Sequence, residues 1–400
     1  MKSIKATYVI IGNGIAGLSA AEEIRKTDSN ATIKIISQEA YLTYYRVKLS
    51  HFISKDPELK QLLIHDENWY KERNIEIILG RRVENIDPIQ STIQLDNGEQ
   101  VIYEKLLIAN GSKAFVPPVE GVEKEGVYTL RSLEDLKEIQ SYLKDCKEVA
   151  VIGGGLLGLE AAWALQERDL KVNVIEFFDY LLPRQLDQEL SSYVKEELEA
   201  RKLNIHLSAA AQELVGDEKV TSVRIKDGRN ITADMVLFSA GIRPNLEIVE
   251  GTDIQINKGI IVDGFMQTSV KNIYAAGDIA EMKGSAMGLW SVAMEQGKVA
   301  GKNMVGNAAM YAPIQPATML SIGGLSLFSA GEINAEKKTL TYRNQEIFHK
   351  LFVEEGKLVG GVLTGDVKKM AKLKKAVNDK VEIQGMIEKG MNALEIIGSL

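Results

Sequence analysis

The sequence predicts an α/β protein in which one strand–turn–helix unit occurs twice and a smaller α+β part follows. The segment 8–21 (Tyr-Val-Ile-Ile-Gly-Asn-Gly-Ile-Ala-Gly-Leu-Ser-Ala-Ala) reappears as 149–162 (Val-Ala-Val-Ile-Gly-Gly-Gly-Leu-Leu-Gly-Leu-Glu-Ala-Ala). The chain contains 34 glycines but only 8 prolines, and 45% of its residues are hydrophobic, as is typical of ordered domains. Its 400 residues exceed the size of one hydrophobic core, so two or three domains are expected.

Composition and charge exclude several classes of protein. The net charge of -7 provides no basic footprint for nucleic acid or acidic lipid. No apolar run is long enough to span a bilayer, and a strand that has begun by Thr7 leaves no room for a signal peptide. We expect no metal site, because the candidate ligands lack metal-binding spacing: His51, His65, His206, His349 and Cys146. One cysteine permits no disulfide within these residues, which favours a reducing, cytoplasmic location.

Each copy of the repeat predicts a buried strand, a Gly-x-Gly-x-x-Gly turn and an alanine-rich helix. In such a turn the first glycine makes the bend, the second lets a pyrophosphate approach, and the third lets helix and strand pack closely. The helix N-terminus then presents amides and a positive dipole end to the phosphates. These glycines are Gly12, Gly14 and Gly17 in the first copy and Gly153, Gly155 and Gly158 in the second. Any tight strand–helix turn can imitate one such motif, but two copies in the same context predict two dinucleotide sites.

An acidic residue follows the second strand of each copy. Glu176 closes a strand eighteen residues beyond Gly158, where a carboxylate binds an adenosine ribose. It would also repel a 2′-phosphate by about 4 kcal/mol at surface-like dielectric. Residues 177–179 (Phe-Phe-Asp) provide no arginine for that phosphate, so NADH is favoured over NADPH. The alternative is a strand-end glutamate that faces water. In the first copy the strand is 33–36, and Glu39 is the ribose candidate.

Two later strands carry a resemblance to a known family. Segment 103–112 ends in Ala109-Asn110-Gly111, and segment 268–278 ends in Gly277-Asp278. With these motifs the chain resembles the FAD-dependent pyridine nucleotide(-disulfide) oxidoreductases of the glutathione-reductase structural class. In that class the first segment is an Ala-Thr-Gly strand, and Asn110 occupies the threonine position in this chain. The aspartate of the second segment contacts the flavin ribityl chain in that class. The return segment 241–245 (Gly-Ile-Arg-Pro-Asn) fits the same pattern, and the resemblance covers nearly the whole chain.

The resemblance implies two nested Rossmann-like dinucleotide-binding domains and a small α+β C-terminal domain. The FAD-binding domain comprises residues 1–114 and 241–310, the NAD-binding domain 115–240, and the C-terminal domain 311–400. A helix that starts within 288–297 would aim its positive dipole end at the flavin pyrimidine edge, where it stabilises negative charge. The alternative is a plain surface helix.

The resemblance also implies a set of cofactor-binding residues for FAD and NADH. They are Gly12, Gly14, Gly17, Glu39, Arg46, Lys48, Val83, Ala109, Gly111, Gly277, Asp278, Ser291, Val292, Gly153, Gly155, Gly158, Glu176 and Gly241.

Residues 41–51 lack the Cys-x-x-x-x-Cys pair that many members carry. This excludes a dithiol relay there, and also the lone-cysteine mechanism that passes through sulfenic acid. Cys146, predicted on the helix before the second nucleotide strand, is interpreted as passive. The string 44–50 (Tyr-Tyr-Arg-Val-Lys-Leu-Ser) instead resembles the branch of the family that has no redox-active thiol. That branch comprises NADH–rubredoxin oxidoreductases, the flavin portion of NADH-dependent nitrite reductase and ferredoxin reductases. It resembles the rubredoxin oxidoreductases most, as do 183–187 (Pro-Arg-Gln-Leu-Asp) and 365–375.

The resemblance implies roles for three charged residues. Arg46 would reach the FAD pyrophosphate, and Lys48 would lie near flavin N5 or the phosphates. Glu160 would lie beside the nicotinamide, paired with a flavin-side lysine. Related ferredoxin reductases usually have that lysine where His51 stands, so Lys48 is the catalytic candidate with Glu160. For each charge the alternative is an ordinary helix surface.

The predicted activity is hydride transfer from NADH to FAD, followed by delivery of single electrons to a small acidic carrier such as rubredoxin. Positioning and the cofactors perform this chemistry, without a general acid or base. Lys368–Lys375, within a predicted helix 366–379, is the candidate docking surface, because basic residues would steer an acidic carrier. The apolar stripe of this helix is Val367, Met370, Leu373, Ala376 and Val377, which leaves five lysines outside. The alternative is a solvated charged face.

Two other functions stay open. The same cofactors would serve an NADH oxidase that reduces oxygen to peroxide. The second alternative is a non-catalytic, NADH-sensing flavoprotein that resembles apoptosis-inducing factor. That branch typically has a larger C-terminal domain, and the roughly ninety residues after position 310 are short for it.

Overall fold

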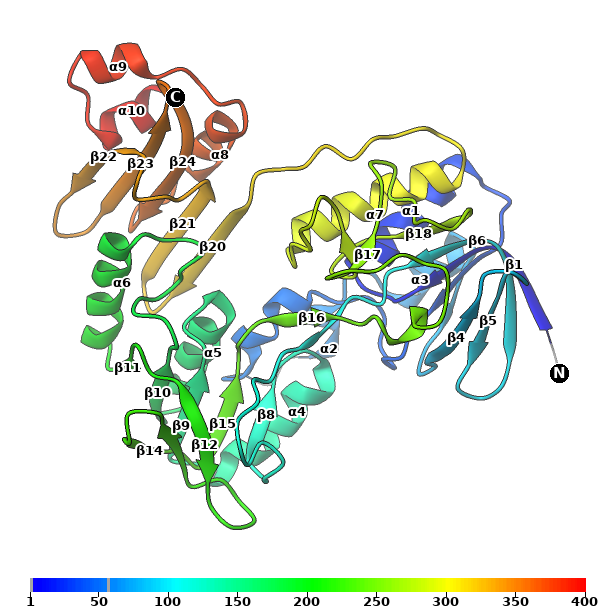
Figure 1. The fold of residues 1–400 in the computed structure, drawn as a ribbon, viewed down its shortest axis with the longest axis horizontal. Coiled ribbons are helices and arrows are strands. Elements are labelled where there is room, and N and C mark those ends of the chain that lie inside the picture. Colours follow the sequence, from blue (N-terminus) through cyan, green and yellow to red (C-terminus); the bar gives the residue numbers. More distant parts are fainter. Residues whose placement is uncertain (1–2, 56–57) are drawn as a thin grey trace. The chain divides into compact units, whose positions relative to one another are not determined.

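The computed structural model describes residues 3–55 and 58–400 (Figure 1). These residues form two compact units. The first unit contains residues 3–48, 58–113 and 242–313, and the second contains 49–55, 114–241 and 314–400. None of the helices in the described part of the chain combines the length and the apolar character needed to cross a membrane.

The first unit is built on a mixed sheet. The strands of this sheet are β1 (Ser3–Ile11), β2 (Ile33–Ile36), β3 (Ile75–Ile78), β4 (Val83–Asp87), β5 (Thr92–Leu95), β6 (Gln100–Ile108) and β18 (Ile273–Ala275). Two small sheets lie outside it, one of β7 (Ser112–Ala114) and β16 (Ile242–Pro244), the other of β17 (Ile260–Ile261) and β19 (Ala280–Glu281). The order β3-β2-β1-β6-β18 is parallel, and β4 and β5 add to the first half of β6 as an antiparallel extension. All four residues of β2 are buried, as expected for a parallel strand covered on both faces.

Two helices of the first unit pack closely because of glycine. The helices are α1 (Ile15–Thr27), α2 (Leu59–Leu62), α3 (Glu67–Glu72) and α7 (Trp290–Met304). A Cβ on Gly297 would lie 2.2 Å from the carbonyl oxygen of Ala16, and one on Gly301 would lie 2.6 Å from that of Ala20. Only glycine therefore allows α7 to approach α1 so closely, which packs the second half of α7 against the first half of α1.

The second unit contains three sheets. Its strands are β8 (Val127–Thr129), β9 (Glu148–Ile152), β10 (Lys171–Ile175), β11 (Asn204–His206), β12 (Ala211–Val215), β13 (Ser222–Ile225), β14 (Asn230–Thr232), β15 (Met235–Phe238), β20 (Ala317–Ile322), β21 (Leu325–Gly331), β22 (Lys338–Arg343), β23 (Phe348–Glu354) and β24 (Lys357–Thr364). The sheet β11-β10-β9-β15-β8 is parallel, whereas β12-β13-β14 and β20-β21-β24-β23-β22 are antiparallel.

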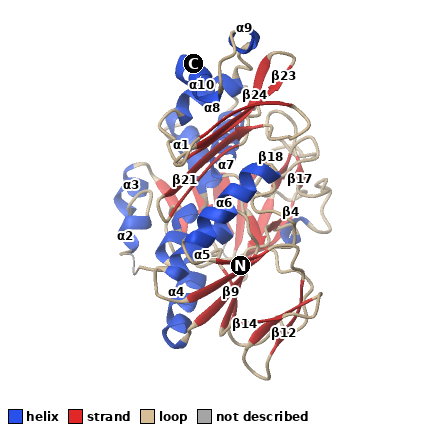
Figure 2. Cartoon of the chain, turned by 90° about the vertical axis from the view of Figure 1, so that its left-hand side faces the viewer, coloured by secondary structure: helices blue, strands red, loops and turns tan. Residues whose placement is uncertain are grey.

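The helices of the second unit are α4 (Leu133–Tyr142), α5 (Leu156–Gln166), α6 (Gln188–Ala200), α8 (Met370–Asn378), α9 (Gln384–Glu388) and α10 (Ala393–Ser399). Helices α8 and α10 pack on the C-terminal antiparallel sheet through a shared apolar core (Figure 2). The stripe predicted for α8 is narrower than expected, because Met370 is 40% exposed while Leu373, Ala376 and Val377 are buried.

A buried ion cluster joins residues 314–400 to the α6 region. The Lys350 ammonium lies 2.6 Å from Asp187 Oδ2 and 2.6 Å from Glu189 Oε2. The Lys350 and Asp187 side chains are only 6% and 5% exposed. Removal of one partner from such a pair leaves an uncompensated buried charge, so the cluster fixes the position of the C-terminal sheet against α6. It also accounts for Asp187, which caps α6 by accepting from the Leu190 amide.

Residues 49–55 belong to the second unit, although they follow the first repeat in sequence. The Gln140 amide donates to the carbonyl oxygens of Phe52 and Lys55 at 2.7 and 2.8 Å. The Ser54 hydroxyl donates to Glu167 Oε2 at 2.9 Å. The predicted domain limits stay a prediction. The compact units differ from them at residues 49–55 and also group 114–241 with 314–400.

Candidate dinucleotide-binding sites

In the first glycine loop the first and third glycines pack directly against backbone atoms, whereas the middle glycine faces open space. Gly12 has φ +108°, and a Cβ there would lie 2.2 Å from the carbonyl oxygen of Ala109. A Cβ on Gly17 would lie 2.1 Å from the Gly12 carbonyl oxygen. At Gly14, by contrast, no described atom lies within 4 Å of the Cβ position. This is the shape that a pyrophosphate requires, so the loop fits the predicted cofactor.

The start of α1 is equipped to receive an anion. Gly14 is its N-cap residue, and no described side chain caps the helix there. Its first turn contains no acidic residue. The first amides of the helix therefore keep their hydrogen-bonding capacity and the positive dipole end for a phosphate.

The second glycine loop repeats this geometry in the second unit. Gly153 has φ +121°, and a Cβ there would lie 2.4 Å from the carbonyl oxygen of Ser239. A Cβ on Gly158 would lie 2.0 Å from the Gly153 carbonyl oxygen. Gly155 again has no described atom within 4 Å of its Cβ position, and it opens α5 without a side-chain cap. The second loop therefore fits a second dinucleotide.

Glu176 is held by the backbone of the second loop. Its Oε2 accepts from the Gly154 amide at 2.5 Å and its Oε1 accepts from the Phe178 amide at 2.8 Å. The residue is only 6% exposed. Each carboxylate oxygen can accept a second hydrogen bond, which leaves capacity for ribose hydroxyls.

Three apolar side chains are exposed around this second loop. Phe177 and Phe178 are 68% and 50% exposed and meet edge to face at 5.4 Å between ring centroids. Leu157, in the first turn of α5, is 52% exposed. Leu157 is not among the residues predicted from the sequence, although an apolar residue two positions after the open glycine is a usable signal. Such surfaces suit the flat rings of a nucleotide.

Glu39 and Arg46 lie together in the first unit. The Glu39 carboxylate accepts from the Tyr44 hydroxyl at 2.6 Å and pairs with Arg46 at 2.5 Å. The guanidinium also lies over the Tyr44 ring, 4.9 Å from its centroid. Burial disfavours the Arg46 charge, but Tyr44, Glu39 and Asp278 outweigh it and raise the pKa of the guanidinium. Arg46 is thus a permanent positive charge in a network that includes both predicted FAD acids.

The strand ends after β6 and β18 meet beside the first loop. Ile108 pairs with both Ile11 and Ala275, so the carboxyl ends of three parallel strands lie at one edge of the sheet. The Ser112 hydroxyl donates to Asp278 Oδ2 at 2.7 Å. Gly111 has φ +67°. Ala109, Gly111 and Asp278 are therefore brought to the same edge as the glycine loop.

Asparagine replaces the expected threonine at position 110 for a structural reason. The Asn110 side-chain amide donates to the Asn245 carbonyl oxygen at 2.9 Å, and the Asn245 side-chain amide donates to the Asn110 carbonyl oxygen at 2.9 Å. The Asn245 backbone amide also donates to the Gly111 carbonyl oxygen at 3.0 Å. This reciprocal clamp joins the strand end to the return segment. Sequence reasoning missed it because its partners are 135 residues apart.

The start of α7 carries an aromatic stack. The Trp290 and Tyr45 rings are stacked with centroids 5.9 Å apart, and the Lys48 ammonium lies 4.4 Å from the Tyr45 centroid. Ser291 and Val292 occupy the first turn of α7, which has no acidic residue. Lys48 itself is exposed. Gly277, with φ +84°, donates its amide to the buried Gln296 side chain of α7 at 2.9 Å, a residue that sequence reasoning did not select.

Glu160 lies on α5 in the second unit, 11% exposed. Its Oε2 accepts from the Ser50 hydroxyl at 2.8 Å, and its Oε1 lies 4.0 Å from His51 Nε2. Burial raises the pKa of the Glu160 carboxyl, although Ser50 and His51 act in the opposite direction. The residues found beside Glu160 within this unit are therefore Ser50 and His51. The predicted pairing with Lys48 stays a prediction.

Two further predicted positions lie at element ends. Val83 begins β4 and is 4% exposed. Gly241 follows β15 with φ +103°, its carbonyl oxygen accepts from the Phe115 amide at 2.9 Å, and its Cβ position is open.

Cys146 lies away from the second glycine loop. It follows the 3₁₀ helix Leu143–Asp145, at the amino end of β9, and not within a helix as predicted. Burial, with Asp234 and Asp145, raises the pKa of its thiol to about 11. It lines a hollow of about 650 Å³ with Tyr128 and Tyr142. A thiol with this pKa is a weak nucleophile at neutral pH.

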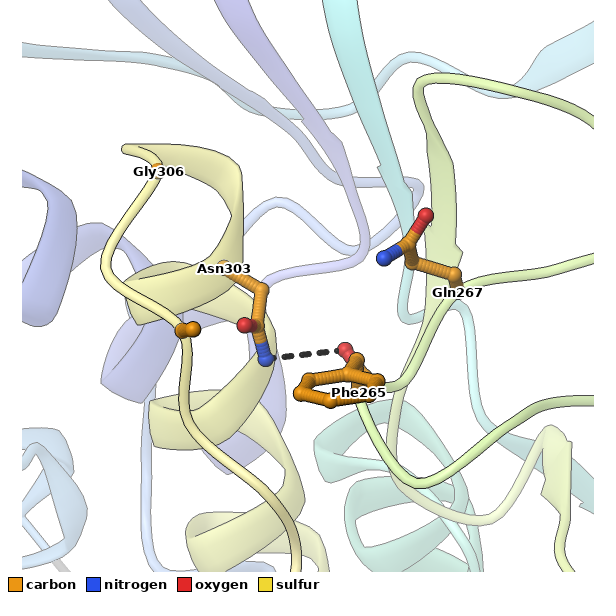
Figure 3. Close-up of a pocket in the computed structure, with 5 residues that line it drawn as sticks. Phe265, Gln267, Asn303 and Gly306 are labelled. Carbon is orange, nitrogen blue, oxygen red and sulfur yellow. Dashed lines mark hydrogen bonds between the residues drawn. The ribbon is translucent and has the colours of Figure 1, made fainter.

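A second hollow, of about 250 Å³, lies in the first unit at the end of α7 (Figure 3). There the Asn303 side-chain amide donates to the Phe265 carbonyl oxygen at 3.0 Å. Neither hollow includes a predicted site residue. Within residues 3–55 and 58–400, no group of three or more His, Cys, Asp and Glu is arranged to hold a metal ion.

Comparison with known proteins identifies the family. Residues 6–297 match the family described as pyridine nucleotide-disulphide oxidoreductase. The chain belongs to this family. Residues 316–381 match the rubredoxin NAD+ reductase C-terminal domain. The predicted family and fold class are thereby confirmed, and the cofactors are FAD and NADH.

Three relatives illustrate the range of the family. The chain is 37% identical over 368 residues to nitrite reductase [NAD(P)H] of Bacillus subtilis, which covers 90% of this chain and 46% of that protein. The chain thus spans about half the length of this relative. It is 34% identical over 381 residues to NADH-rubredoxin oxidoreductase of Clostridium acetobutylicum, covering 94% and 95% of the two chains. The structure of a NAD-dependent persulfide reductase from A. fulgidus superimposes with a TM-score of 0.88 at 30% identity, over 95% of this chain and 78% of that one.

Proposed function

We propose that this chain is an FAD-dependent NADH oxidoreductase that passes single electrons to a small acidic carrier protein, rubredoxin or a protein of the same kind. The observation that carries the proposal is the two glycine loops, each closed on the protein side and open at Gly14 or Gly155. The choice of carrier is supported by the end-to-end alignment with NADH-rubredoxin oxidoreductase and by the matched C-terminal domain.

The first loop is assigned to FAD. Gly14 and the start of α1 would receive the pyrophosphate, with Arg46 as its positive partner, while Glu39 would bind the adenosine ribose. Asp278 would bind the ribityl chain. The uncapped start of α7 would face the flavin pyrimidine edge, where its positive dipole end favours negative charge. The other assigned contacts are Gly12, Gly17, Lys48, Val83, Ala109, Gly111, Gly277, Ser291 and Val292.

The second loop is assigned to NADH. In the sheet order β11-β10-β9-β15-β8, the chain leaves β9 toward β10 on one side, and β15 lies on the other. Dinucleotides bind at the carboxyl ends of the strands where the order reverses. The pyrophosphate would therefore lie at Gly155, the adenosine ribose at Glu176, and the nicotinamide half toward Gly241. Gly153 and Gly158 shape the loop.

When bound, FAD supplies the redox chemistry, since it accepts a hydride from NADH and releases electrons one at a time. The residues of the chain bind and orient the two nucleotides, Glu160 beside the nicotinamide and Lys48 on the flavin side. The weakly acidic Cys146 thiol is at the amino end of β9, whereas dinucleotides bind at carboxyl ends. A route through a thiol, as in a persulfide reductase, is therefore not favoured.

The proposed docking surface for the carrier is the lysine-rich start of α8. Lys368, Lys369 and Lys372 are exposed. Lys375 is also exposed but pairs with Asp379, so it contributes less to a positive field. Reversal of Lys369 and Lys372 to glutamate should raise the KM for rubredoxin, most strongly at low salt, because steering by exposed charges is screened. The matched control is Lys389→Glu on the same domain, and an equal effect there would remove α8 as the docking surface.

One experiment tests the proposed function. FAD-loaded protein is mixed anaerobically with NADH and then with rubredoxin, and the flavin and rubredoxin absorbance bands are followed by stopped flow. Fast flavin bleaching followed by rubredoxin reduction within one turnover is the expected result. Bleaching without transfer would reject rubredoxin and direct the search to oxygen, measured as oxygen uptake, or to a nitrite-reducing partner. Absence of bleaching would reject the NADH oxidoreductase itself.

A further inference from the structure

Glu160 has a histidine beside it within the second unit. The carboxylate accepts from Ser50 at 2.8 Å and faces His51 Nε2 at 4.0 Å. Glu160 is 11% exposed, whereas His51 is 51% exposed. The buried acid and the half-exposed base lie at ion-pair distance, so the charge of each affects how tightly the other holds a proton.

The segment that carries His51 is fixed to the same unit as Glu160. Gln140 donates to the carbonyl oxygens of Phe52 and Lys55, and Ser54 donates to Glu167, the C-cap residue of α5, seven residues after Glu160. These hydrogen bonds lie on the C-terminal side of His51, and the hydrogen bond from Ser50 to Glu160 lies on its N-terminal side. The segment that carries His51 is therefore held against α5 on both sides.

The charge of this site depends on two groups. The titratable group that faces Glu160 is His51, and Glu160 is the acid that faces His51. Glu167, the next acid along that face of α5, is bound by Ser54 and by the Trp163 indole. Burial raises the pKa of the Glu160 carboxyl, and histidine is the type of side chain that changes charge most readily near physiological pH, so the contact brings together two groups that can exchange a proton with solvent.

The position of the pair relates it to the nicotinamide, an argument that rests on the proposed function. Glu160 is five residues beyond Gly155, or about 7.5 Å along the helix at 1.5 Å per residue. This is on the order of the span from a pyrophosphate to the nicotinamide it carries. The oxidised nicotinamide ring bears a positive charge that the reduced ring lacks, so a nearby carboxylate distinguishes the two.

We propose that His51 and Glu160 together hold one exchangeable proton beside the nicotinamide, and that the pair releases it when NAD+ binds but keeps it when the reduced nucleotide binds. The proton passes to solvent through half-exposed His51, while no covalent bond forms and no electron moves in this step. Affinity for NAD+ relative to NADH therefore increases with pH, so that release of the product NAD+ is easier at lower pH.

Binding to the oxidised, FAD-loaded protein tests this without turnover. The Kd of NAD+ and of 1,4,5,6-tetrahydro-NAD, which has an uncharged ring and cannot donate hydride, is measured by calorimetry from pH 6 to 8.5. We expect the affinity for NAD+ to rise relative to the analogue, at up to about tenfold per pH unit for one proton released. Buffers of different ionisation enthalpy should report the released proton directly. Equal slopes for the two ligands would overturn the proposal.

Two variants identify the pair as the origin of the slope. His51→Lys provides a permanent positive charge that holds Glu160 ionised, so the relative affinity should become independent of pH across this range. Glu167→Gln is the matched control on the same helix and should keep the slope of the parent protein. A slope that persists in His51→Lys, or that disappears in Glu167→Gln, would contradict the assignment.

A direct titration needs no nicotinamide. The chain has four histidines, so the C2–H resonance of His51 can be assigned by its loss in His51→Gln. The pH dependence of this resonance should change in Glu160→Gln, because the neighbouring negative charge is removed. An unchanged pH dependence would show that the two groups are not coupled and would overturn the inference. Failure to bind NAD+ at any pH would reject the proposed function together with the inference, whereas binding that is independent of pH rejects the inference alone.

Discussion

The two glycine loops have the same backbone geometry but hold their acids differently. Glu176 directly follows β10, is 6% exposed and is fixed by two backbone amides. The equivalent position after β2 is Ser37, and Glu39 lies two residues further on, held by the side chains of Tyr44 and Arg46. The acid of the second loop is thus positioned by its own loop, whereas the acid of the first depends on a side-chain network. Repetition of a motif preserves the backbone more strictly than it preserves the recognition of the ribose.

The loops also differ one turn into the helix. Glu160 of the second copy occupies the position of Ser19 in the first, which is buried and uncharged. At this position, therefore, the second copy has a titratable group and the first does not. The difference suits a site whose ligand changes charge when it reacts, because a nearby acid can respond to that change.

The largest effect should come from the glycines whose contacts are the same in both loops. Gly17→Ala and Gly158→Ala would place a Cβ about 2 Å from a backbone oxygen, and neither backbone can shift cheaply. We expect each to cost about 3 kcal/mol or more in the free energy of unfolding of its own unit. Thermal unfolding monitored by circular dichroism measures this. A large loss in one variant and none in the other would break the equivalence of the two loops.

The next largest effect should separate the two acids. Glu176→Ala leaves the buried Gly154 amide and the part-buried Phe178 amide without this acceptor and should cost about 2 kcal/mol. Glu39→Ala removes an ion pair whose side chains are 24% and 30% exposed, so about 1 kcal/mol or less is expected. Urea unfolding of the two variants compares them. Equal losses would show that the backbone clamp on Glu176 contributes no more than the side-chain network.

The open glycines should affect affinity and not stability. Gly14 and Gly155 have φ of -85° and -82°, which alanine adopts, and their Cβ positions contact no described atom. A methyl group there would nevertheless occupy the space for a pyrophosphate. We expect about a tenfold loss of FAD affinity in Gly14→Ala and of NADH affinity in Gly155→Ala, or about 1.4 kcal/mol each. Cross-effects, in which Gly14→Ala weakens NADH instead, would reverse the assignment of the loops.

The smallest effect concerns the pH dependence that Glu160 adds to the second copy. Its pKa is raised by burial, so the folded protein binds a proton more tightly than the unfolded chain does. The associated stability is present at low pH and is lost as the pH rises through the folded pKa. Glu160→Gln should therefore raise the unfolding temperature at pH 8, by the equivalent of about 1 kcal/mol, and leave it unchanged near pH 4. The same shift at both values would show that charge is not the cause.

Much of both sites is predictable because it is local. The two glycine loops, the strand 33–36 and the acid after residues 171–175 follow from spacing and from the buried character of the strands. Predictions that depend on the environment of an element were less accurate. Met370 fits the stripe of α8 by periodicity but is exposed, and the strand ending at Asp278 comprises only Ile273–Ala275. Periodicity indicates which residues share a face, but not how far the neighbouring element extends over it.

The sequence by itself determined two dinucleotide loops, a chain without a cysteine pair, and an acid suited to NADH, because strand–turn–helix geometry and cysteine count are local or arithmetic properties. Only the tertiary structure decided that residues 49–55 pack on α5 and that His51 faces Glu160. It also decided that Lys350 is buried with Asp187 and Glu189. These partners are more than a hundred residues apart in the chain. Their contact depends on how whole elements pack, which no local pattern of residues encodes.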